Sequence, residues 1–572
     1  MSINKMSQGD MQMKTTPILL ILSLAMWSWA GPAAGAADKA TVEVDKAGPA
    51  DPAGGDLFSI SPGPIEDPDV VWSKRIPVAG EEITISARVR GKGKHPVAVR
   101  FVLDAMGAPK VTLSAGPSDR QDGKGQYVDY EAAWKPSETG LYRLTVTVDP
   151  EKKAGDPATE NNVAVVTIPV VWRDLHFLAW GDQKRAKWIS TGCSVWGRSL
   201  VDIPYWHRRG TLALGRITMK GIWKVGGLSA EEAAQRLMKV VERYRKRGAD
   251  GLAIDELGGT YAAKLGLAFD RLHDKYPKFR VYIWITGGIT RDEVSCAQRN
   301  EHILMGNIFE RHIDNFGPNF PAALAHRLRM LQGDGMIDPP GEVVIISLAV
   351  GRTYRPQIES NVRLYRKLAP AMPGILYYDI PRRFYIPEFA MLEGDQGEYK
   401  GSFQEFLDDL TLRYFIKPVL MVEENNIWVS QYYPRRGNSV SIQARIHNTG
   451  GMAARNVGVK IYARHLGSNK RELLTATIVP KIGHGGRWTT DKERANAPAD
   501  NAVVDGTKHP VWYYRPRQGF VELSRALVDA QWRPAGSGYY SIEVELDSSE
   551  QYTALEGFAK RLVSVAEKNE KR

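Results

Sequence analysis

The sequence of 572 residues contains only two cysteines, Cys193 and Cys296, and lacks the short motifs of several common enzyme classes. Two cysteines on separate predicted elements exclude a disulfide framework and the usual zinc-ligand spacing, and we expect no bridge between them. There is no H-E-x-x-H, no P-loop, no G-x-G-x-x-G after a strand and no G-x-S-x-G. These absences argue against zinc proteases, nucleotide-binding enzymes and serine esterases, and we assign neither a cofactor nor a metal ligand.

Long apolar runs are missing as well, except near the N-terminus. Met13 and Lys14 precede an apolar run over residues 18–29, and Ala34-Gly35-Ala36 has the small residues of a cleavage site. This pattern predicts a secretory signal peptide over residues 1–36. No later stretch approaches about 18 uninterrupted apolar residues, so we expect no transmembrane segment after cleavage. The mature protein is predicted to be exported, to the periplasm, the medium or the cell surface.

Charge is not concentrated in any tract, although the formal net charge is +11 at pH 7. A basic exported protein can attract acidic polysaccharide, anionic lipid or nucleic acid. The absence of a Lys/Arg-rich tract argues against nucleic acid. Charge alone leaves acidic polysaccharide and anionic lipid open, as well as an excess merely spread over a large surface. The residues of the barrel rim, described below, are what make polysaccharide or another glycan, acidic ones included, the expected partner, and the oligomeric state stays open.

The first folded region is predicted to be a β-sandwich. Residues 37–68 are rich in Ala, Gly, Pro and Asp, as in a flexible leader. Over residues 69–173, runs such as 82–89 and 142–148 alternate apolar and polar residues, with Gly/Pro/Asp-rich turns between them. Glu160-Asn161-Asn162 precedes a last strand. Several short strands with no helix between them are typical of an Ig-like sandwich.

The middle region, residues 174–417, alternates strands with helices. Most of its eight candidate strands are followed by helical patterns; the strands are residues 175–180, 191–196, 212–218, 251–255, 281–286, 303–309, 343–350 and 375–379. This arrangement predicts a (β/α)8 barrel of the TIM type. The segment between the first two strands is too short for a full helix, which predicts a distorted barrel.

Strands return after a predicted linker, residues 418–426. The region 427–567 contains an alternating run at 439–447, an N-x-G turn at 448–450 and the sequence N-V-G-V-K-I-Y at 456–462, followed later by a long polar insertion. The pattern predicts a second β-sandwich.

Both flanking regions resemble the CARDB family of Ig-like bacterial adhesion-type modules. The E-N-N element before the last strand of the first region and the N-V-G-V-K-I-Y strand after the N-x-G turn of the second are similar to that family's pattern. The resemblance implies Ig-like sandwiches whose role is mostly structural or adhesive.

Residues 248–259 are the stretch on which the prediction of a site rests. A helix begins at Ser229, where Glu232 completes a capping box, and Gly248 is placed to end it. The apolar strand that follows ends at Asp255, and a second helical pattern comes after it. Helix, buried strand, helix is typical of a parallel sheet, in which ligands gather at the carboxyl ends of the strands.

A barrel brings the ends of all its strands to one rim, and this rim is predicted to carry carboxylates, arginines and aromatic rings. Its members are Trp180, Trp196, Arg216, Asp255, Glu256, Trp284, Glu310, Arg352, Tyr378 and Asp379. Sugar hydrolysis uses this mixture, because one carboxyl protonates the leaving oxygen while a second attacks or activates water. Aromatic faces cover sugar rings, and arginines orient hydroxyl or acidic groups.

The middle region resembles glycoside hydrolases of the (β/α)8 type, and Asp250-Gly251-Leu252-Ala253-Ile254-Asp255 is similar to the D-G-x-D-x-D-x-E element of the chitinase-like family. Ala253 replaces the middle Asp and Leu257 stands where the catalytic Glu would be, so the substrate-assisted mechanism of that family is not implied. The resemblance implies a reacting acid at this strand end. It singles out Asp255 first and Glu256 second, with Glu310 as partner; the other seven rim residues are assigned to substrate binding.

Strand alternation places Ala253, Asp255 and Leu257 on one inward face. Asp255 and Glu256 can then pair only if the strand breaks at Asp255. The function predicted is an exported carbohydrate-active protein that hydrolyses glycosidic bonds.

The alternative is a non-catalytic cell-surface, adhesion or glycan-binding protein with a degenerate barrel. Each aromatic residue can simply pack the core, Asp379 can pair with Arg382 or Arg383, and Glu310 can pair with Arg311. An open cleft in which Asp255 faces another carboxyl favours the enzyme. A mouth plugged by residues 198–227 favours the scaffold.

Overall fold

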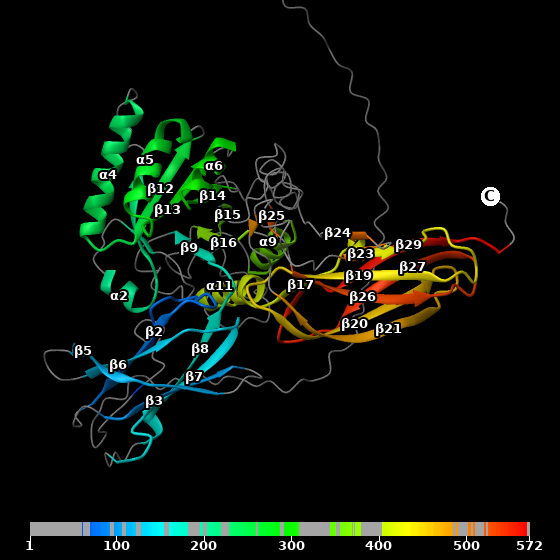
Figure 1. Cartoon of the computed structure of the whole chain (residues 1–572), viewed down its shortest axis with the longest axis horizontal. Helices are drawn as coiled ribbons and strands as arrows, with labels where there is room; N and C mark the ends of the chain where they lie inside the picture. Colours follow the sequence, from blue (N-terminus) through cyan, green and yellow to red (C-terminus); the bar gives the residue numbers. More distant parts are fainter. Residues whose placement is uncertain are drawn as a thin grey trace, which may run out of the picture. The chain divides into compact units, whose positions relative to one another are not determined.

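The fold is described from a computed structural model of the whole chain (Figure 1). The structure describes residues 60, 69–91, 97–105, 110–121, 127–153, 159–180, 195–197, 203–218, 228–258, 261–286, 291–307, 344–349, 355–368, 370, 372–378, 403–483, 488–489, 502–504, 507–509, 520–521 and 524–568. All of them belong to one compact unit, residues 54–572. The predicted signal peptide and nearly all of the predicted leader lie outside the described residues and stay predictions.

The first region consists of two four-stranded sheets, in the orders β1-β2-β6-β5 and β4-β3-β7-β8. Its strands are β1 (Val70–Trp72), β2 (Ile83–Arg90), β3 (Val99–Ala105), β4 (Val111–Leu113), β5 (Gly116–Gln121), β6 (Tyr127–Trp134), β7 (Gly140–Val148) and β8 (Val163–Val170). Alternate residues of β2 are buried, and they share one apolar core with residues of the second sheet. The E-N-N element lies in a 3-10 turn, η1 (Thr159–Asn162), directly before β8.

Eight parallel strands form the middle region, each paired with the next, and the last pairs with the first. They are β9 (His176–Trp180), β10 (Val195–Gly197), β11 (Ala213–Thr218), β12 (Gly251–Gly258), β13 (Arg280–Thr286), β14 (Ile303–Asn307), β15 (Val344–Ala349) and β16 (Gly374–Tyr378). All eight overlap the strands predicted from sequence, and they close into a barrel. The closure is thinnest at β10, which pairs with β9 through Val195 and Ala179 only. This is the unit in which the sequence predicted distortion.

Helices accompany this sheet in the sequence, most clearly on either side of β12. The described helices are α2 (Ile203–Arg208), α4 (Ala230–Lys246), α5 (Tyr261–Lys275), α6 (Arg291–Arg299), α9 (Arg355–Leu368) and α11 (Phe403–Thr411), the last continued by one π turn, η5 (Leu412–Ile416). None of the described helices is long and apolar enough to span a bilayer.

Two apolar clusters divide the side chains of the barrel between its inside and its outside. The inner cluster holds Leu178, Leu214, Ala253, Trp284 and Met305, which stand on five of the strands. The outer cluster joins the other face of the strands to the helices. Because the interior is filled by side chains, the barrel is a packed core whose ends, not its centre, are available for binding.

The last region is a second pair of sheets around its own core. One sheet contains β17 (Val419–Met421), β18 (Ile427–Val429), β19 (Val440–Asn448), β26 (Ser524–Trp532) and β28 (Thr553–Glu556). The other is β21 (Arg471–Ile482), β20 (Ala454–His465), β27 (Gly538–Leu546) and β29 (Phe558–Val565). Two short antiparallel pairs are β22 (Trp488–Thr489) with β25 (Phe520–Val521) and β23 (Ala502–Val504) with β24 (Thr507–His509). Of these strands, β22, β23 and β24 lie in the predicted polar insertion, residues 484–519, and β25 directly follows it.

The prediction of a linker over residues 418–426 is wrong. Val419, Leu420 and Met421 are fully buried and form β17, which pairs with β19 and β28. A 3-10 turn, η6 (Glu424–Asn426), follows. The segment is therefore built into the second sandwich, since Leu420 pairs with Asn448 of β19 and Val419 with Thr553 of β28. The other domain boundaries stay predictions.

Candidate functional site

The helix before β12 positions the candidate site from outside the barrel. The Ser229 hydroxyl accepts a hydrogen bond from the Glu232 backbone N–H and the Glu232 carboxylate accepts one from the Ser229 backbone N–H, so the predicted capping box is present. Gly248 ends the helix with φ +88°, a conformation that favours glycine. The predicted helix, α4, is thus fixed at both ends.

Tyr244, in the last turn of α4, ties the helix to the strand that carries Arg216. Its hydroxyl donates a hydrogen bond to the carbonyl oxygen of Arg216, at 2.7 Å. Its ring lies against Gly215, where an added Cβ would be 2.3 Å from Tyr244 Cδ1. No role was predicted for Tyr244 from the sequence. A glycine inside the strand was the available signal, because such a glycine often marks a close approach of another group.

Strand β12 carries an irregularity at the two predicted acids. Ile254 pairs with Ile283 of β13 and Leu257 with Ile285, so Asp255 and Glu256 together stand opposite Trp284. Two residues opposite one define a β-bulge, a feature that re-aims side chains and is common next to active sites. The bulge supplies the break in the strand at Asp255 that pairing of the two acids requires.

The bulge also corrects the predicted placement of Leu257. Strict alternation put Ala253, Asp255 and Leu257 on one face, but Leu257 belongs to the outer cluster with Ile254, whereas Ala253 lies in the inner cluster. One extra residue in the strand changes the face of everything that follows it. Asp255 keeps its predicted inward side, because its partner Arg216 shares the face of Leu214 on β11.

Asp255 and Arg216 form an ion pair at the carboxyl ends of β12 and β11. Arg216 Nε donates to Asp255 Oδ2 at 3.1 Å, and Arg216 Nη2 contacts the same oxygen. The Asp255 side chain is 11% exposed and that of Arg216 is 31% exposed. The guanidinium thus holds the Asp255 carboxylate in place through charge-assisted hydrogen bonds. Among the predicted site residues, the structure thus brings Asp255 and Arg216 into contact.

Trp284, opposite the bulge, is 6% exposed and packs in the inner cluster with residues such as Met305 and Leu376. Its ring therefore fills the barrel interior directly beneath the bulge.

The structure does not place the side chains of the remaining predicted site residues. Glu310, Arg352 and Asp379 fall outside the described residues. The structure gives only the backbone of the other four: Trp180 and Tyr378 at the ends of β9 and β16, Trp196 in the middle of β10, and Glu256 in the bulge of β12. Their assigned roles stay predictions. Within the described ranges, no group of three or more His, Cys, Asp and Glu side chains is placed to hold a metal ion. Cys296 is a buried free thiol.

No protein-family model matches the chain, and no curated protein matches it in sequence. A CARDB domain from Pyrococcus furiosus, solved with di-metal ions, is 16% identical, covering 27% of this chain and 91% of that one, with a TM-score of 0.17. A cycloisomaltooligosaccharide glucanotransferase from Paenibacillus sp. is 10% identical over 81% of this chain and 69% of that one, with a TM-score of 0.28.

The catalytic domain of a hyperthermophilic chitinase from Pyrococcus furiosus is 12% identical, covering 36% of this chain and 83% of that one, with a TM-score of 0.25. The solved structures similar to parts of this chain thus include a CARDB domain and carbohydrate-active enzymes. Their TM-scores are too low for these likenesses to carry an argument about its fold or activity.

Proposed function

We propose that the protein is an exported carbohydrate-active enzyme, a (β/α)8 barrel of the glycoside-hydrolase type between two CARDB-type sandwiches, and that it hydrolyses glycosidic bonds. The observation that carries the proposal is the position of Asp255. It is a buried carboxylate on the inward face of a closed parallel barrel, at the carboxyl end of its strand and inside a bulge. That end of such a barrel is where catalytic groups stand in proteins of this architecture.

Asp255 takes the role of the carboxylate that attacks the sugar or activates water. Its contact with Arg216 suits this role, because the guanidinium fixes the position of the carboxylate oxygen that a nucleophile or a base uses. The donor in this proposal is Glu256 or Glu310.

The bulge leaves both donors possible in geometric terms. A retaining glycosidase needs its two carboxyl groups about 5–5.5 Å apart, and an inverting one needs about 6.5–9.5 Å, to leave room for water. In a regular strand, neighbours point to opposite faces, which would leave only Glu310 as partner. Since the register shift lies at Asp255 and Glu256, the adjacent pair becomes a second possibility.

One observation favours the alternative, a non-catalytic glycan-binding or adhesion protein. The Asp255–Arg216 pair is a neutral unit on the wall of a packed barrel, and such a pair also serves to hold two neighbouring strands in register. In this alternative the barrel carries the two sandwiches, and glycan binds without being cleaved.

The full mature chain should be screened against neutral and acidic polysaccharides for released reducing ends, with binding measured in parallel. Cleavage supports the enzyme, and the Asp255→Asn protein should then lose at least about two orders of magnitude in turnover, the low end for one acid/base group. Binding with no cleavage of any substrate rejects the hydrolase and leaves the alternative.

Salt dependence then separates acidic from neutral substrates. Exposed charges are screened over about 8 Å at physiological ionic strength, so binding of an acidic glycan should weaken steeply with added salt. Retention that does not change with salt points to a neutral glycan.

A further inference from the structure

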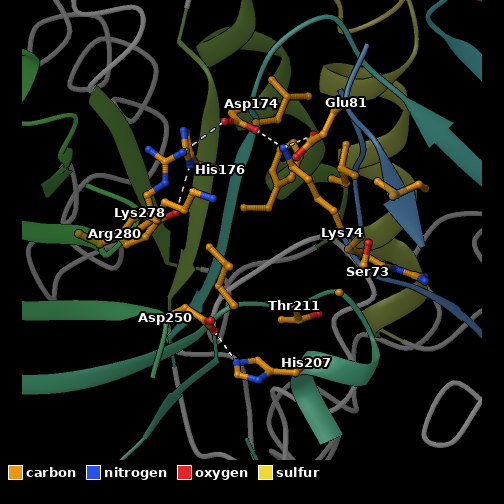
Figure 2. A pocket seen from close by; sticks show the side chains of 18 of the residues that line it. Ser73, Lys74, Glu81, Asp174, His176, His207, Thr211, Asp250, Lys278 and Arg280 are labelled. Atoms are coloured by element: carbon orange, nitrogen blue, oxygen red, sulfur yellow. Dashed lines mark hydrogen bonds and ion pairs between the residues drawn. The ribbon is translucent and has the colours of Figure 1, made fainter. Parts of the chain in front are cut away.

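A cavity of about 430 Å³ lies at the opposite end of the barrel from Asp255, where the strands begin. Figure 2 shows its labelled side chains converging from two parts of the chain. His176 and Arg280 are the first residues of β9 and β13 and line one side, while Lys74 and Glu81 of the first sandwich line the other. The volume is within the range of ligand pockets, about 300–1,000 Å³.

Polar contacts hold the lining together, and one of them, between Lys74 and Asp174, joins the two sides of the cavity. Lys74 Nζ lies 2.6 Å from Glu81 Oε2 and 2.6 Å from Asp174 Oδ1, and Arg280 Nη2 lies 3.6 Å from Asp174 Oδ2. His207 Nε2 lies 2.8 Å from Asp250 Oδ2. These paired side chains also place hydrogen-bond donors and acceptors at fixed positions around the cavity.

The lining is balanced in charge, which restricts the chemistry of an occupant. Four Lys/Arg and four Asp/Glu side chains line the cavity. His176 adds no fixed charge near neutral pH, because burial lowers its pKa to about 4 despite the nearby Asp174 carboxylate. With no excess of either sign, the cavity offers nothing that prefers an ion to a neutral polar molecule.

His176 is a neutral hydrogen-bonding group inside this charged ring. Its Nδ1 lies 3.2 Å from the Tyr282 hydroxyl, and the edges of the two rings meet with centroids 5.8 Å apart. The contact fixes the ring, so that Nε2 remains as the atom with which His176 can meet a ligand. Apolar surface from Ile76, Leu175 and Phe177 completes the lining.

We propose that this cavity binds a neutral polyhydroxylated ligand of about one or two sugar units, as a site separate from the one at Asp255. Its hydroxyl groups would bond to the fixed charged groups and to His176, and its C–H face would lie on the apolar part of the lining. Because the ligand contacts both the first sandwich and the barrel, its binding stabilises their junction.

The test is calorimetric titration of the full chain with glucose, galactose, N-acetylglucosamine, maltose and cellobiose, together with thermal unfolding in their presence. At least one sugar should bind and raise the unfolding midpoint. In His176→Leu, which keeps the bulk of the side chain but loses its polar atoms, binding should weaken about fivefold to tenfold, as expected for one lost hydrogen bond.

Three further variants give the controls. Lys278→Ala, at an exposed position of the lining, should weaken binding about threefold without affecting the fold. Lys239→Ala, an equally exposed lysine on α4, should leave binding unchanged. Asp255→Asn should also bind the sugar as the wild type does, whether or not the chain is an enzyme.

Any of four results overturns the proposal. The first is that the folded chain binds none of the five sugars, and the second is that both His176→Leu and Lys278→Ala bind as the wild type does. The third is loss of binding in Asp255→Asn, which would place the sugar site at the carboxyl end of the barrel. The fourth is that glucuronate or sulfate binds in preference to every neutral sugar.

Discussion

The two ends of the barrel both carry a carboxylate paired with a cation, but the pairs are set in different surroundings. At the amino end, Asp174 pairs with Lys74 of the first sandwich and Arg280 of the barrel, so the contact connects two parts of the chain. At the carboxyl end, Asp255 and Arg216 stand on neighbouring strands, and Asp255 lies in a bulge.

The difference shows that an ion pair by itself does not mark a reactive site. The pair at the amino end is accounted for by the junction that it holds. The pair at the carboxyl end sits where the regular backbone is interrupted, and an interruption of this kind re-aims a side chain. The backbone irregularity, together with the end of the barrel on which it lies, is what sets Asp255 apart.

The largest expected effect tests how tightly the strand starts are packed at the amino end. An added Cβ at Gly374, the first residue of β16, would lie 1.8 Å from the His176 carbonyl oxygen and 2.6 Å from its carbon. Backbone atoms cannot move aside, so Gly374→Ala should cost about 3 kcal/mol or more, a fall of about 6–12 °C in the thermal midpoint. Gly116→Ala, with nothing within 4 Å of its added Cβ, is the control. Equal midpoints for the two variants would show that the strand starts are not tightly packed.

An acid titration tests whether the amino end is held by a neutral His176. Burial lowers the pKa of His176 to about 4, below its usual 6.5. Its contribution to stability is therefore complete above pH 6.5 and is lost as the pH falls through about 4. Between pH 7 and pH 4 the thermal midpoint of the wild type should fall further than that of His176→Leu. His302 and His447, whose pKa burial lowers to about 3, affect both proteins alike. Parallel curves would mean that His176 is not desolvated.

A smaller effect is expected from the sandwich–barrel ion pairs. The Lys74 side chain is 32% exposed, so solvent screens its contacts with Glu81 and Asp174. Lys74→Met should lower the free energy of unfolding by about 1 kcal/mol, the upper end for partly exposed pairs, and the loss should shrink in high salt. Lys110→Met, which breaks a more exposed pair with Asp104, serves as the control. A loss several times larger would make Lys74 a main support of the junction.

Much of the architecture could be predicted from sequence because it depends on local patterns. Ser229, Glu232 and Gly248 fix the ends of α4 through contacts within a few residues. The alternation of β2 reports directly on one buried face. For the same reason all eight barrel strands could be placed, although only their pairing shows that they close.

What could not be predicted depends on contacts between distant residues. The bulge at Asp255 exists only in the register of β12 against β13, and without it Leu257 was assigned to the wrong face. Val419 to Met421 looked like a linker because three residues are too few to show an alternating pattern, and one of their partner strands, β28, lies more than a hundred residues along the chain. The cavity at the amino end combines residues about a hundred positions apart, as in the contact of Lys74 with Asp174.

The most direct test exchanges one carboxylate at each end for its amide and measures turnover on a polysaccharide that the wild type cleaves. Asp255→Asn should retain a cooperative thermal transition and lose at least about a hundredfold in turnover. Asp174→Asn should keep turnover within about threefold of the wild type, since the ion pairs that it loses lie at the amino end of the barrel, away from Asp255. Near-normal turnover in Asp255→Asn, or an equal loss in both variants, would contradict the assignment of the chemistry to the carboxyl end.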